Sequence, residues 1–285
     1  MQMKFRPMSE LLADARTRGY ALPSFCAWNA ESMEAILRVA EDLRAPVILM
    51  NGPGEFGVLP PLLMGAVAHT VAARFRVPAA LHLDHGDSVD LVEVCLAAGY
   101  TSVMLDYSSR PFAENAAALQ QVVALARPCG VTVEGELGHV GKADTMTAEG
   151  NGDSTLTEAA DAVAYVAQTG VDALAVSIGN AHGQYTKLPT FDFPRLEQIH
   201  AAIRIPLVLH GGSGTPGDDL RRAISLGMLK INVATELTMA LREGLTAELD
   251  APQRRWFPMS LADAMRRLAP VAEKWIRLTG AAGRA

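Results

Sequence analysis

The sequence lacks the features that would place a protein in a membrane or in an oxidising compartment. It has only three cysteines in 285 residues, Cys26, Cys95 and Cys129. They are widely spaced and odd in number, which argues against a disulfide framework and against a cysteine zinc cluster. No N-terminal signal pattern occurs, and no apolar run is long enough to span a bilayer. We therefore expect a cytoplasmic protein.

Positive charge is also scarce. Lysine and arginine together number 25 against 31 acidic residues, so the formal net charge is -6. This balance argues against nucleic acid or an anionic membrane as the main partner. Hydrophobic residues make up 49% of the chain, enough for a large core. Because no linker or shift in composition divides the chain, we expect a single domain over residues 1–285, with an N-terminal helix and a C-terminal helical extension.

Strand and helix signals alternate along the whole chain. Apolar runs predict strands over residues 21–27, 45–50, 78–85, 101–105, 131–134 (ending near Glu136), 173–178, 207–210 and 229–233. Helical spacing predicts helices over residues 8–18 (capped by Ser9), 30–43, 62–75, 89–98, 112–126, 158–169, 193–203, 219–226 and 261–278. Alternation of this kind implies parallel strands with right-handed crossovers. It favours an α/β fold of the (β/α)8 TIM barrel type, with an open doubly wound sheet as the alternative.

Three predicted strands end in histidine followed by glycine. Asp84 and His85 stand side by side before Gly86, and similar endings occur at His182 and His210. One such ending alone is more typical of a polar strand terminus with a helix cap. In a barrel, however, the carboxyl ends of the strands meet at one face, where active sites lie. Three imidazoles meeting there predict a metal site with an open position, the pattern of a catalytic zinc that acts as a Lewis acid.

Other polar residues fall near the same face. Asp106 follows the fourth predicted strand and Glu136 lies at the end of the fifth. For His82, a place in a polar layer inside the barrel is the simpler interpretation. For His139, a solvated loop position is as reasonable as a role in the site.

The last two strand ends predict a phosphate site. Gly211-Gly212-Ser213-Gly214 follows the seventh strand, and Asn232-Val233-Ala234-Thr235 follows the eighth and opens a helix. Glycine backbone N–H groups, the hydroxyls of Ser213 and Thr235, and a helix N-terminus all favour an oxyanion. One glycine-rich turn is weak support, but barrels often bind phosphate in these same two loops.

The residues also carry a resemblance that spans most of the chain. The sequence resembles the class II, zinc-dependent fructose-bisphosphate and tagatose-bisphosphate aldolases, particularly their shorter branch. The similar segments, in family order and at compatible spacing, are residues 20–23, 45–48, 83–85, 102–106, 136–138, 179–183, 210–214 and 230–236.

This resemblance implies roles for the residues at matching positions. It implies that His85, His182 and His210 bind Zn²⁺, that Asp106 and Glu136 lie near an alternative metal position, and that Asp84 is the catalytic acid and base. It implies a site for dihydroxyacetone phosphate, assisted by a monovalent cation (Na⁺ or K⁺), at Gly183, Gly211, Gly212, Ser213, Asn232, Val233, Ala234 and Thr235. It also implies a homodimer or homotetramer.

The implied reaction is the reversible cleavage of a ketose (bis)phosphate to dihydroxyacetone phosphate and an aldehyde through a zinc-stabilised enediolate, as in glycolysis. Two alternatives stay open. One is a noncatalytic barrel that stabilises a partner aldolase, against which the retention of the three histidines and Asp84 argues. The other is an isomerase that stops at the enediolate.

Several positions depart from the family pattern. Cys26, Asn51 and Ser109 differ from the residues usual at these places, which leaves the acceptor aldehyde open. In the loop after Glu136, Asp144 is the nearest acid and the candidate for the first deprotonation.

Two further segments have two interpretations each. Residues 142–154 are polar and rich in glycine, and they are interpreted as a mobile lid or as a tolerated surface loop. Arg254-Arg255-Trp256 loosely resembles a family element that contacts substrate phosphate, sometimes across subunits. A solvated basic turn is an equal alternative there.

Overall fold

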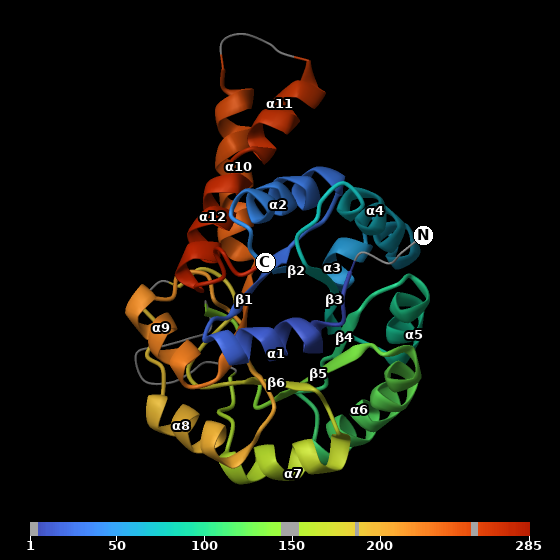
Figure 1. The fold of residues 1–285 in the computed structure, drawn as a ribbon, viewed down its shortest axis with the longest axis vertical. Coiled ribbons are helices and arrows are strands. Elements are labelled where there is room, and N and C mark those ends of the chain that lie inside the picture. Colours follow the sequence, from blue (N-terminus) through green and yellow to red (C-terminus); the bar gives the residue numbers. More distant parts are fainter. Residues whose placement is uncertain (1–4, 144–153, 186–187, 252–255) are drawn as a thin grey trace.

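A computed structural model of the chain describes residues 5–143, 154–185, 188–251 and 256–285. Parallel strands, hydrogen-bonded to one another in chain order, close into a barrel (Figure 1). They are β1 Leu22–Cys26, β2 Val47–Asn51, β3 Ala79–Gly86, β4 Ser102–Leu105, β5 Thr132–Leu137, β6 Ala173–Val176, β7 Leu207–Leu209 and β8 Met228–Val233. The prediction of a (β/α)8 TIM barrel is confirmed, and the open-sheet alternative is wrong.

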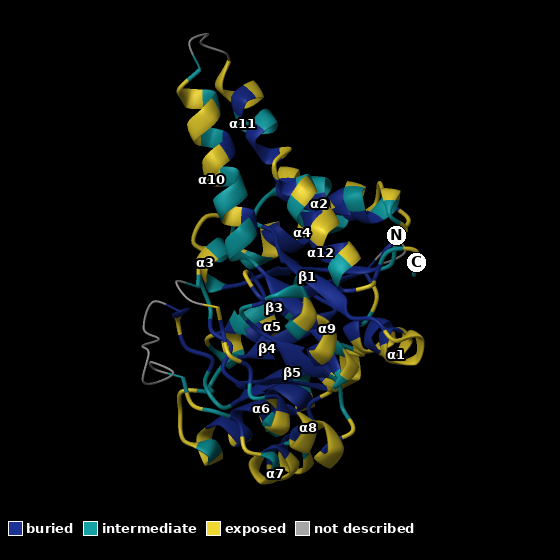
Figure 2. Ribbon diagram, turned by 90° about the vertical axis from the view of Figure 1, so that its left-hand side faces the viewer, coloured by how far each residue is buried: buried dark blue, intermediate teal, exposed yellow. Residues whose placement is uncertain are grey.

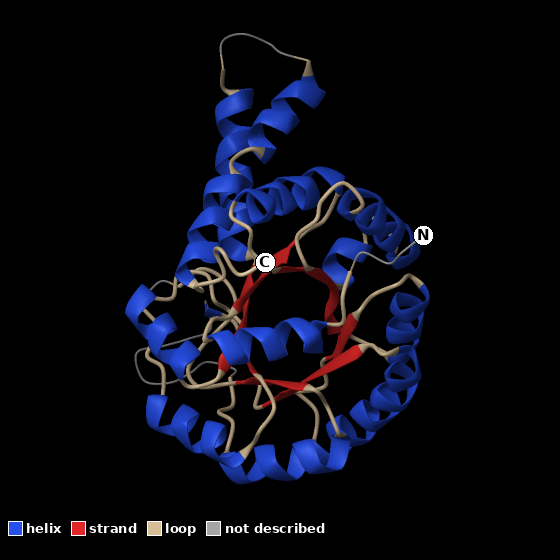
Figure 3. Ribbon diagram, in the orientation of Figure 1, coloured by secondary structure: helices blue, strands red, loops and turns tan. Residues whose placement is uncertain are grey.

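A ring of helices surrounds the barrel (Figure 3). The helices are α1 Met8–Arg18, α2 Ala30–Asp42, α3 Pro53–Phe56, α4 Pro61–Ala72, α5 Val89–Ala97, α6 Phe112–Ala126, α7 Ala159–Thr169, α8 Phe193–Ala202, α9 Gly217–Ser225, α10 Thr235–Leu249, α11 Phe257–Met265 and α12 Leu268–Leu278, with a 3-10 turn at Arg127–Cys129. The strands are buried, whereas exposed residues face outward on the helices (Figure 2). Among the described residues, no helix is both long and apolar enough to cross a membrane.

Helix α2 illustrates why these segments are helical. Its buried residues Met33, Ile36, Leu37 and Ala40 recur at the three- and four-residue spacing of one helix face. Asn29 caps the first turn, since its side chain accepts the Ser32 N–H at 2.9 Å. The sequence therefore specifies both the start of this helix and the face that packs on the barrel.

Helix α1 lies across one end of the barrel and closes it (Figure 1, Figure 3). It buries Met8, Leu11, Leu12 and Ala15. The predicted cap by Ser9 is wrong: Pro7 precedes the helix without a side-chain cap, and the Ser9 backbone N–H donates to Thr132 Oγ1 at 2.9 Å.

Another expectation at the level of secondary structure is wrong. The segment 261–278 is not one helix, because α11 ends at Met265 and α12 begins at Leu268. Helix α11 packs mainly on α10 and helix α12 mainly on α2, and α12 also contacts α10. The short helix α3, which begins at Pro53, was not predicted from the sequence.

A layer of polar side chains crosses the barrel interior. Lys230 Nζ lies 2.9 Å from Glu134 Oε2 and 3.2 Å from His82 Nε2, and His82 Nδ1 lies 2.8 Å from Ser102 Oγ. All four side chains are fully buried, and a cation at such depth requires a paired anion. Burial and the neighbouring Lys230 lower the pKa of His82, so its ring is neutral. The interpretation of His82 as part of an interior polar layer agrees with these contacts.

Glu236 joins the C-terminal helix to the loop after β7. Its Oε1 accepts the Gly214 N–H at 3.0 Å, and its Oε2 accepts hydrogen bonds from Lys274 Nζ at 2.8 Å and Trp275 Nε1 at 3.0 Å. Burial alone would raise the pKa of Glu236, but these hydrogen bonds outweigh it and lower the pKa. The carboxylate therefore contributes stability above the unfolded pKa and loses it as the pH falls through the folded pKa.

We expect Glu236→Gln to reduce the free energy of unfolding at pH 7 by about 1–2 kcal/mol, because hydrogen bonds to a charged acceptor are lost. The difference from wild type should shrink as the pH falls below about 4.3, the ordinary glutamate pKa. Urea unfolding at several pH values measures this. Glu273→Gln, at an exposed pair with Arg277, is the matched control with little expected effect. A pH-independent difference would contradict the account.

Candidate metal centre and active site

The three predicted histidines lie at the carboxyl ends of three strands. His85 belongs to β3, while His182 follows β6 in a loop and His210 comes directly after β7. The β3 register shifts between Leu83 and Gly86, and His85 has a φ of 48°. A left-handed backbone costs a residue other than glycine on the order of 1–3 kcal/mol. This cost indicates that the surrounding structure fixes the direction of the His85 ring.

The structure brings these three rings together. The ring centroids of His85 and His210 are 4.6 Å apart, those of His85 and His182 are 4.9 Å apart, and those of His182 and His210 are 5.5 Å apart. One ring nitrogen from each lies within 4.8 Å of the other two. Three histidines distant in the sequence therefore meet at one point.

Each ring is held from behind by a hydrogen-bond acceptor. His85 Nδ1 lies 2.6 Å from Asp106 Oδ2, and His182 Nδ1 lies 3.1 Å from the carbonyl oxygen of Val140. His210 Nε2 lies 3.1 Å from Glu134 Oε1. Because a carbonyl and ionised carboxylates only accept, these nitrogens carry the protons. In a neutral ring, the opposite nitrogen carries the lone pair that a metal ion needs, as in proteins whose histidines bind metals.

Those opposite nitrogens are buried and have no hydrogen-bond partner. They are His85 Nε2, His182 Nε2 and His210 Nδ1. Leaving one buried polar atom unsatisfied costs about 1–3 kcal/mol, so three at one point are a large cost unless a cation satisfies them together. Glu136 Oε2 is also without a hydrogen bond and lies 2.9 Å from His210 Nδ1. The donor set fits a divalent metal ion with imidazole ligands.

The electrostatic environment favours a cation. Burial disfavours the charged form of His210, but the carboxylates of Glu134 and Glu136 outweigh it and raise its pKa to about 10. Burial and the neighbouring rings lower the pKa of His182 to about 4. The carboxylates thus stabilise positive charge beside His210, and a metal ion that binds there would displace the second proton of that ring.

Asp84 lies between the rings and the interior polar layer. Asn232 Nδ2 donates to Asp84 Oδ1 at 2.9 Å, and His85 Nε2 lies 3.9 Å from Asp84 Oδ2. Burial opposes ionisation, but His85, His82 and Lys230 outweigh it and hold the pKa of Asp84 well below its usual range. The carboxylate is therefore ionised at neutral pH, with one oxygen anchored and the other beside the histidines.

The loops after β7 and β8 form one surface next to the histidines. The Gly212 N–H donates to the Asn232 carbonyl at 3.0 Å, and the Glu236 N–H donates to Ser213 Oγ at 3.2 Å. Gly211 has a φ of 65°, and a Cβ there would lie 1.9 Å from the Ala181 carbonyl oxygen, so only glycine fits. The Ser213 hydroxyl thereby lies at the N-terminus of α10, which begins at Thr235, where an anion is favoured.

Some of the remaining predicted site residues lie near the histidines, and others lie outside the described residues. Gly183 has a φ of 104° and follows His182, and Asp106 and Glu136 both belong to the histidine cluster through the contacts above. Asp144 and most of the 142–154 segment lie outside the described residues, as do Arg254 and Arg255. A hydrogen bond links Gly141, just before this segment, to Ser154, its last residue: the Gly141 N–H donates to Ser154 Oγ at 2.9 Å.

The positions that depart from the family pattern do not share one environment. Cys26 Sγ lies 3.4 Å from Glu55 Oε1, and burial raises the pKa of its thiol well above its usual range. Asn51 is buried and accepts a hydrogen bond from the Tyr100 hydroxyl. Ser109 is exposed, whereas its neighbour Ser108 contacts His139 Nδ1 at 2.9 Å.

Reasoning from the sequence missed Glu134 and Lys230. Glu134 and Glu136 are two residues apart on β5, and Lys230 and Asn232 are two apart on β8. On a strand, residues two apart share a face, so both pairs point into the barrel. The two-residue spacing could therefore have identified Glu134 and Lys230 as residues that face the barrel interior. Strand patterns cannot place the Val140 carbonyl, because it comes from a loop.

The comparisons with known proteins agree with this geometry. Residues 6–284 match the model of the family described as fructose-bisphosphate aldolase class-II. The solved YdjI aldolase of Escherichia coli K12 is 31% identical, with a TM-score of 0.87 and 99% of each chain covered. A putative fructose-1,6-biphosphate aldolase of Coccidioides immitis is 27% identical, with a TM-score of 0.86 and 96% of each chain covered.

A fructose-bisphosphate aldolase of Campylobacter jejuni shares the fold at 22% identity, with a TM-score of 0.79 and with 98% of this chain and 95% of that chain covered. Because the family model spans nearly the whole chain, the match includes every element that carries the histidine cluster. The chain belongs to the class-II fructose-bisphosphate aldolase family and is a class II aldolase, a lyase built on a TIM barrel.

Proposed function

We propose that this aldolase reversibly cleaves a phosphorylated ketose to dihydroxyacetone phosphate and an aldehyde, with Zn²⁺ held by His85, His182 and His210. The observation that carries the proposal is the convergence of three unpartnered imidazole nitrogens within 4.8 Å of one another. Zinc suits three nitrogen ligands with an open position, and a zinc ion there supplies a Lewis acid for carbonyl and hydroxyl oxygens. The whole chain, 1–285, acts in this proposal as one barrel domain.

The carboxylates around the rings have separate tasks in this proposal. Asp106 and Glu134 orient His85 and His210 through the hydrogen bonds described above. Glu136, with Asp106, provides an alternative position for the metal, since one oxygen of each lies within 4.8 Å of His85. The site thus has ligands for two positions of one ion.

Asp84 is the catalytic acid and base. Its ionised form removes the proton of a substrate hydroxyl during cleavage, and its protonated form returns that proton during condensation. The Asn232 amide fixes Oδ1, so Oδ2 is the oxygen available to substrate. Asp144 is the proposed base for the other proton transfer, at the hydroxymethyl carbon of dihydroxyacetone phosphate.

The loops after β6, β7 and β8 hold the phosphate. The proposed contacts come from Gly183, Gly211, Gly212, Ser213, Asn232, Val233, Ala234 and Thr235, with Na⁺ or K⁺ as an additional counter-ion. Binding the phosphate far from the reacting carbon fixes the orientation of the substrate, and orientation of this kind supplies a large part of catalysis. The loop geometry at Gly211 and the N-terminus of α10 support this assignment.

Two substitutions test the separate roles of metal binding and proton transfer. We expect His210→Ala to abolish stoichiometric zinc binding, because only two imidazoles remain. We expect Asp84→Ala to retain zinc and to lose about 10²- to 10⁴-fold in kcat, the usual contribution of a positioned acid or base. Zinc is measured by equilibrium dialysis, and activity by release of dihydroxyacetone phosphate from a panel of ketose phosphates.

The matched control is His69→Ala, which removes an imidazole bonded to the Gly99 carbonyl outside the cluster. It should keep both zinc and activity. Full activity of either site variant would contradict the assignment, as would zinc retained by His210→Ala.

The α10–α11 hairpin supports a homodimer or homotetramer. It projects from the barrel (Figure 1) and exposes Leu249, Trp256, Phe257 and Met259, with relative exposures of 66%, 77%, 58% and 51%. Exposed apolar groups gathered in this way are typical of an interaction surface.

We propose that this hairpin contacts another copy of the chain. Replacing Trp256, Phe257 and Met259 with serine should yield a monomer by light scattering, because the apolar contact is lost. Val58→Ser, at an exposed apolar residue elsewhere, is the control and should leave the mass unchanged. An unchanged mass in the triple variant would show that the interface lies elsewhere.

A further inference from the structure

A cavity of about 720 Å³ lies at the end of the barrel opposite the histidines. Its walls come from the amino-terminal ends of β7 and β8 and from the carboxyl ends of α1, α8, α9 and α12, as Ile205, Leu229, Gly19 and Ser225 indicate. The volume falls in the range of sites for small molecules, about 300–1,000 Å³. The proposed aldolase reaction uses none of the residues that line it.

The residues that line this cavity include four arginines. Arg16, Arg204, Arg221, Arg277 and His200 line it, and no aspartate or glutamate is among the lining residues. This is the reverse of the chain as a whole, whose formal net charge is -6. A local excess of cations in an acidic protein favours an anionic ligand.

Two of the arginines are paired at the surface. Arg221 lies 2.5 Å from Asp218, whose side chain is 94% exposed, and Arg277 lies 2.8 Å from Glu273, whose side chain is 50% exposed. Exposed ion pairs of this kind stabilise by about 0–1 kcal/mol, so a ligand can displace them at little cost. Their guanidinium groups therefore stay available.

The side chains of Arg16 and Arg204 have no hydrogen bond or ion pair with any residue that the structure describes. Positive side chains commonly lie near helix carboxyl ends because of the helix dipole, and Arg16 is in the last turn of α1. The helix dipole would fully explain Arg16 if its guanidinium donated a hydrogen bond to a backbone carbonyl. Arg18 does this, since it donates to the carbonyl oxygen of Arg284 at 2.5 Å. The donors of Arg16 and Arg204 instead remain free for a ligand, and a guanidinium offers five.

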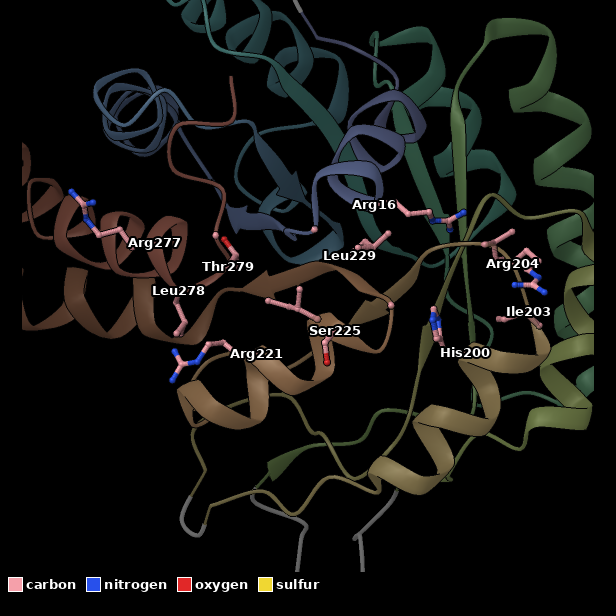
Figure 4. A pocket seen from close by; sticks show the side chains of 15 residues that line it. Arg16, His200, Ile203, Arg204, Arg221, Ser225, Leu229, Arg277, Leu278 and Thr279 are labelled. Atoms are coloured by element: carbon pink, nitrogen blue, oxygen red, sulfur yellow. The ribbon is translucent and has the colours of Figure 1, made fainter.

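The charged groups surround an apolar floor. Figure 4 shows Arg16, His200 and Arg204 on one side and Arg221 with Arg277 on the other. Ile203 and Leu229, each 5% exposed, belong to the lining. A ligand that satisfies both features has an anionic group and an apolar body.

The wall at His200 is shaped by a glycine. Gly227 has a φ of 91°, and a Cβ at this position would lie 2.3 Å from His200 Nδ1. The His200 ring can therefore occupy its place beside the arginines only because residue 227 has no side chain. This packing fixes the position of one wall of the cavity.

We propose that this cavity is a second ligand site, which binds a phosphate ester with a flat apolar body, of the nucleoside phosphate class. The phosphate contacts the guanidinium groups of Arg16 and Arg204, because arginine binds phosphate oxygens in a bidentate manner. The base covers Ile203 and Leu229. A sugar phosphate shares the anionic group but has no apolar face to cover Ile203 and Leu229. Inorganic phosphate has the anionic group alone.

The test uses adenosine monophosphate as the probe and the full-length zinc-loaded enzyme, with saturating dihydroxyacetone phosphate to fill the active site. Titration calorimetry should show saturable binding. Arg16→Gln/Arg204→Gln should weaken it at least about tenfold, because the charge-assisted hydrogen bonds to the phosphate are lost. Both side chains are exposed, so folding and cleavage activity should be unchanged.

Arg38→Gln/Arg74→Gln is the matched control, because it removes two exposed arginines that pair with Glu34 elsewhere on the surface. It should bind the probe as wild type does. Inorganic phosphate and fructose 6-phosphate should each bind at least about tenfold more weakly than the nucleotide, because neither buries the apolar floor. Saturation by the nucleotide with this order of ligands would support the proposal.

The proposal is overturned if no saturable nucleotide binding occurs up to about 1 mM, which is already a weak affinity for a small ligand. It is also overturned if wild type and the Arg16/Arg204 variant bind the nucleotide equally well. Equal affinity for the nucleotide and a sugar phosphate would overturn it as well. The active-site experiments do not depend on this outcome. A failure here would therefore leave the aldolase assignment unchanged.

Discussion

Three hydrogen bonds behind the imidazole rings set the chemistry of the barrel mouth. Asp106, the Val140 carbonyl and Glu134 each accept one ring N–H, so the remaining nitrogens of His85, His182 and His210 face a common point. Without these bonds, either ring nitrogen could be protonated and the rings could turn. With them, the three nitrogens that face the common point are held in place before any ion arrives, so the ordering cost is met by folding rather than by binding.

The barrel brings the three histidines to one end, and local irregularities of the backbone set the direction of their side chains. Parallel strands bring their carboxyl ends together, but a regular strand would leave His85 pointing along the alternation of β3. The register shift and the positive φ of His85 reorient it. Beneath it, the Lys230–Glu134 pair stabilises the carboxylate that orients His210, and so a buried ion pair in the barrel core is joined directly to the proposed metal centre.

The sequence specifies the barrel well because strands repeat every two residues and helices every 3.6. It also marks His85, His182 and His210, since each directly precedes a glycine at or after the end of a strand. It cannot show which acceptor holds each ring, because those contacts join residues far apart, such as Glu134 and His210. The break between α11 and α12 escaped prediction for a similar reason: helical spacing continues through it, and the main packing partner changes from α10 to α2 only in the folded chain.

The central claim is the proposed binding of one metal ion by the three histidines, and X-ray absorption at the zinc edge of the zinc-loaded enzyme tests it most directly. The account predicts three imidazole nitrogens at about 2.0–2.1 Å, with the remaining ligands oxygen. This first shell should persist when the enzyme is free of substrate. A shell with one imidazole or none, or one made of carboxylate oxygens alone, would contradict the assignment of His85, His182 and His210 as the metal ligands.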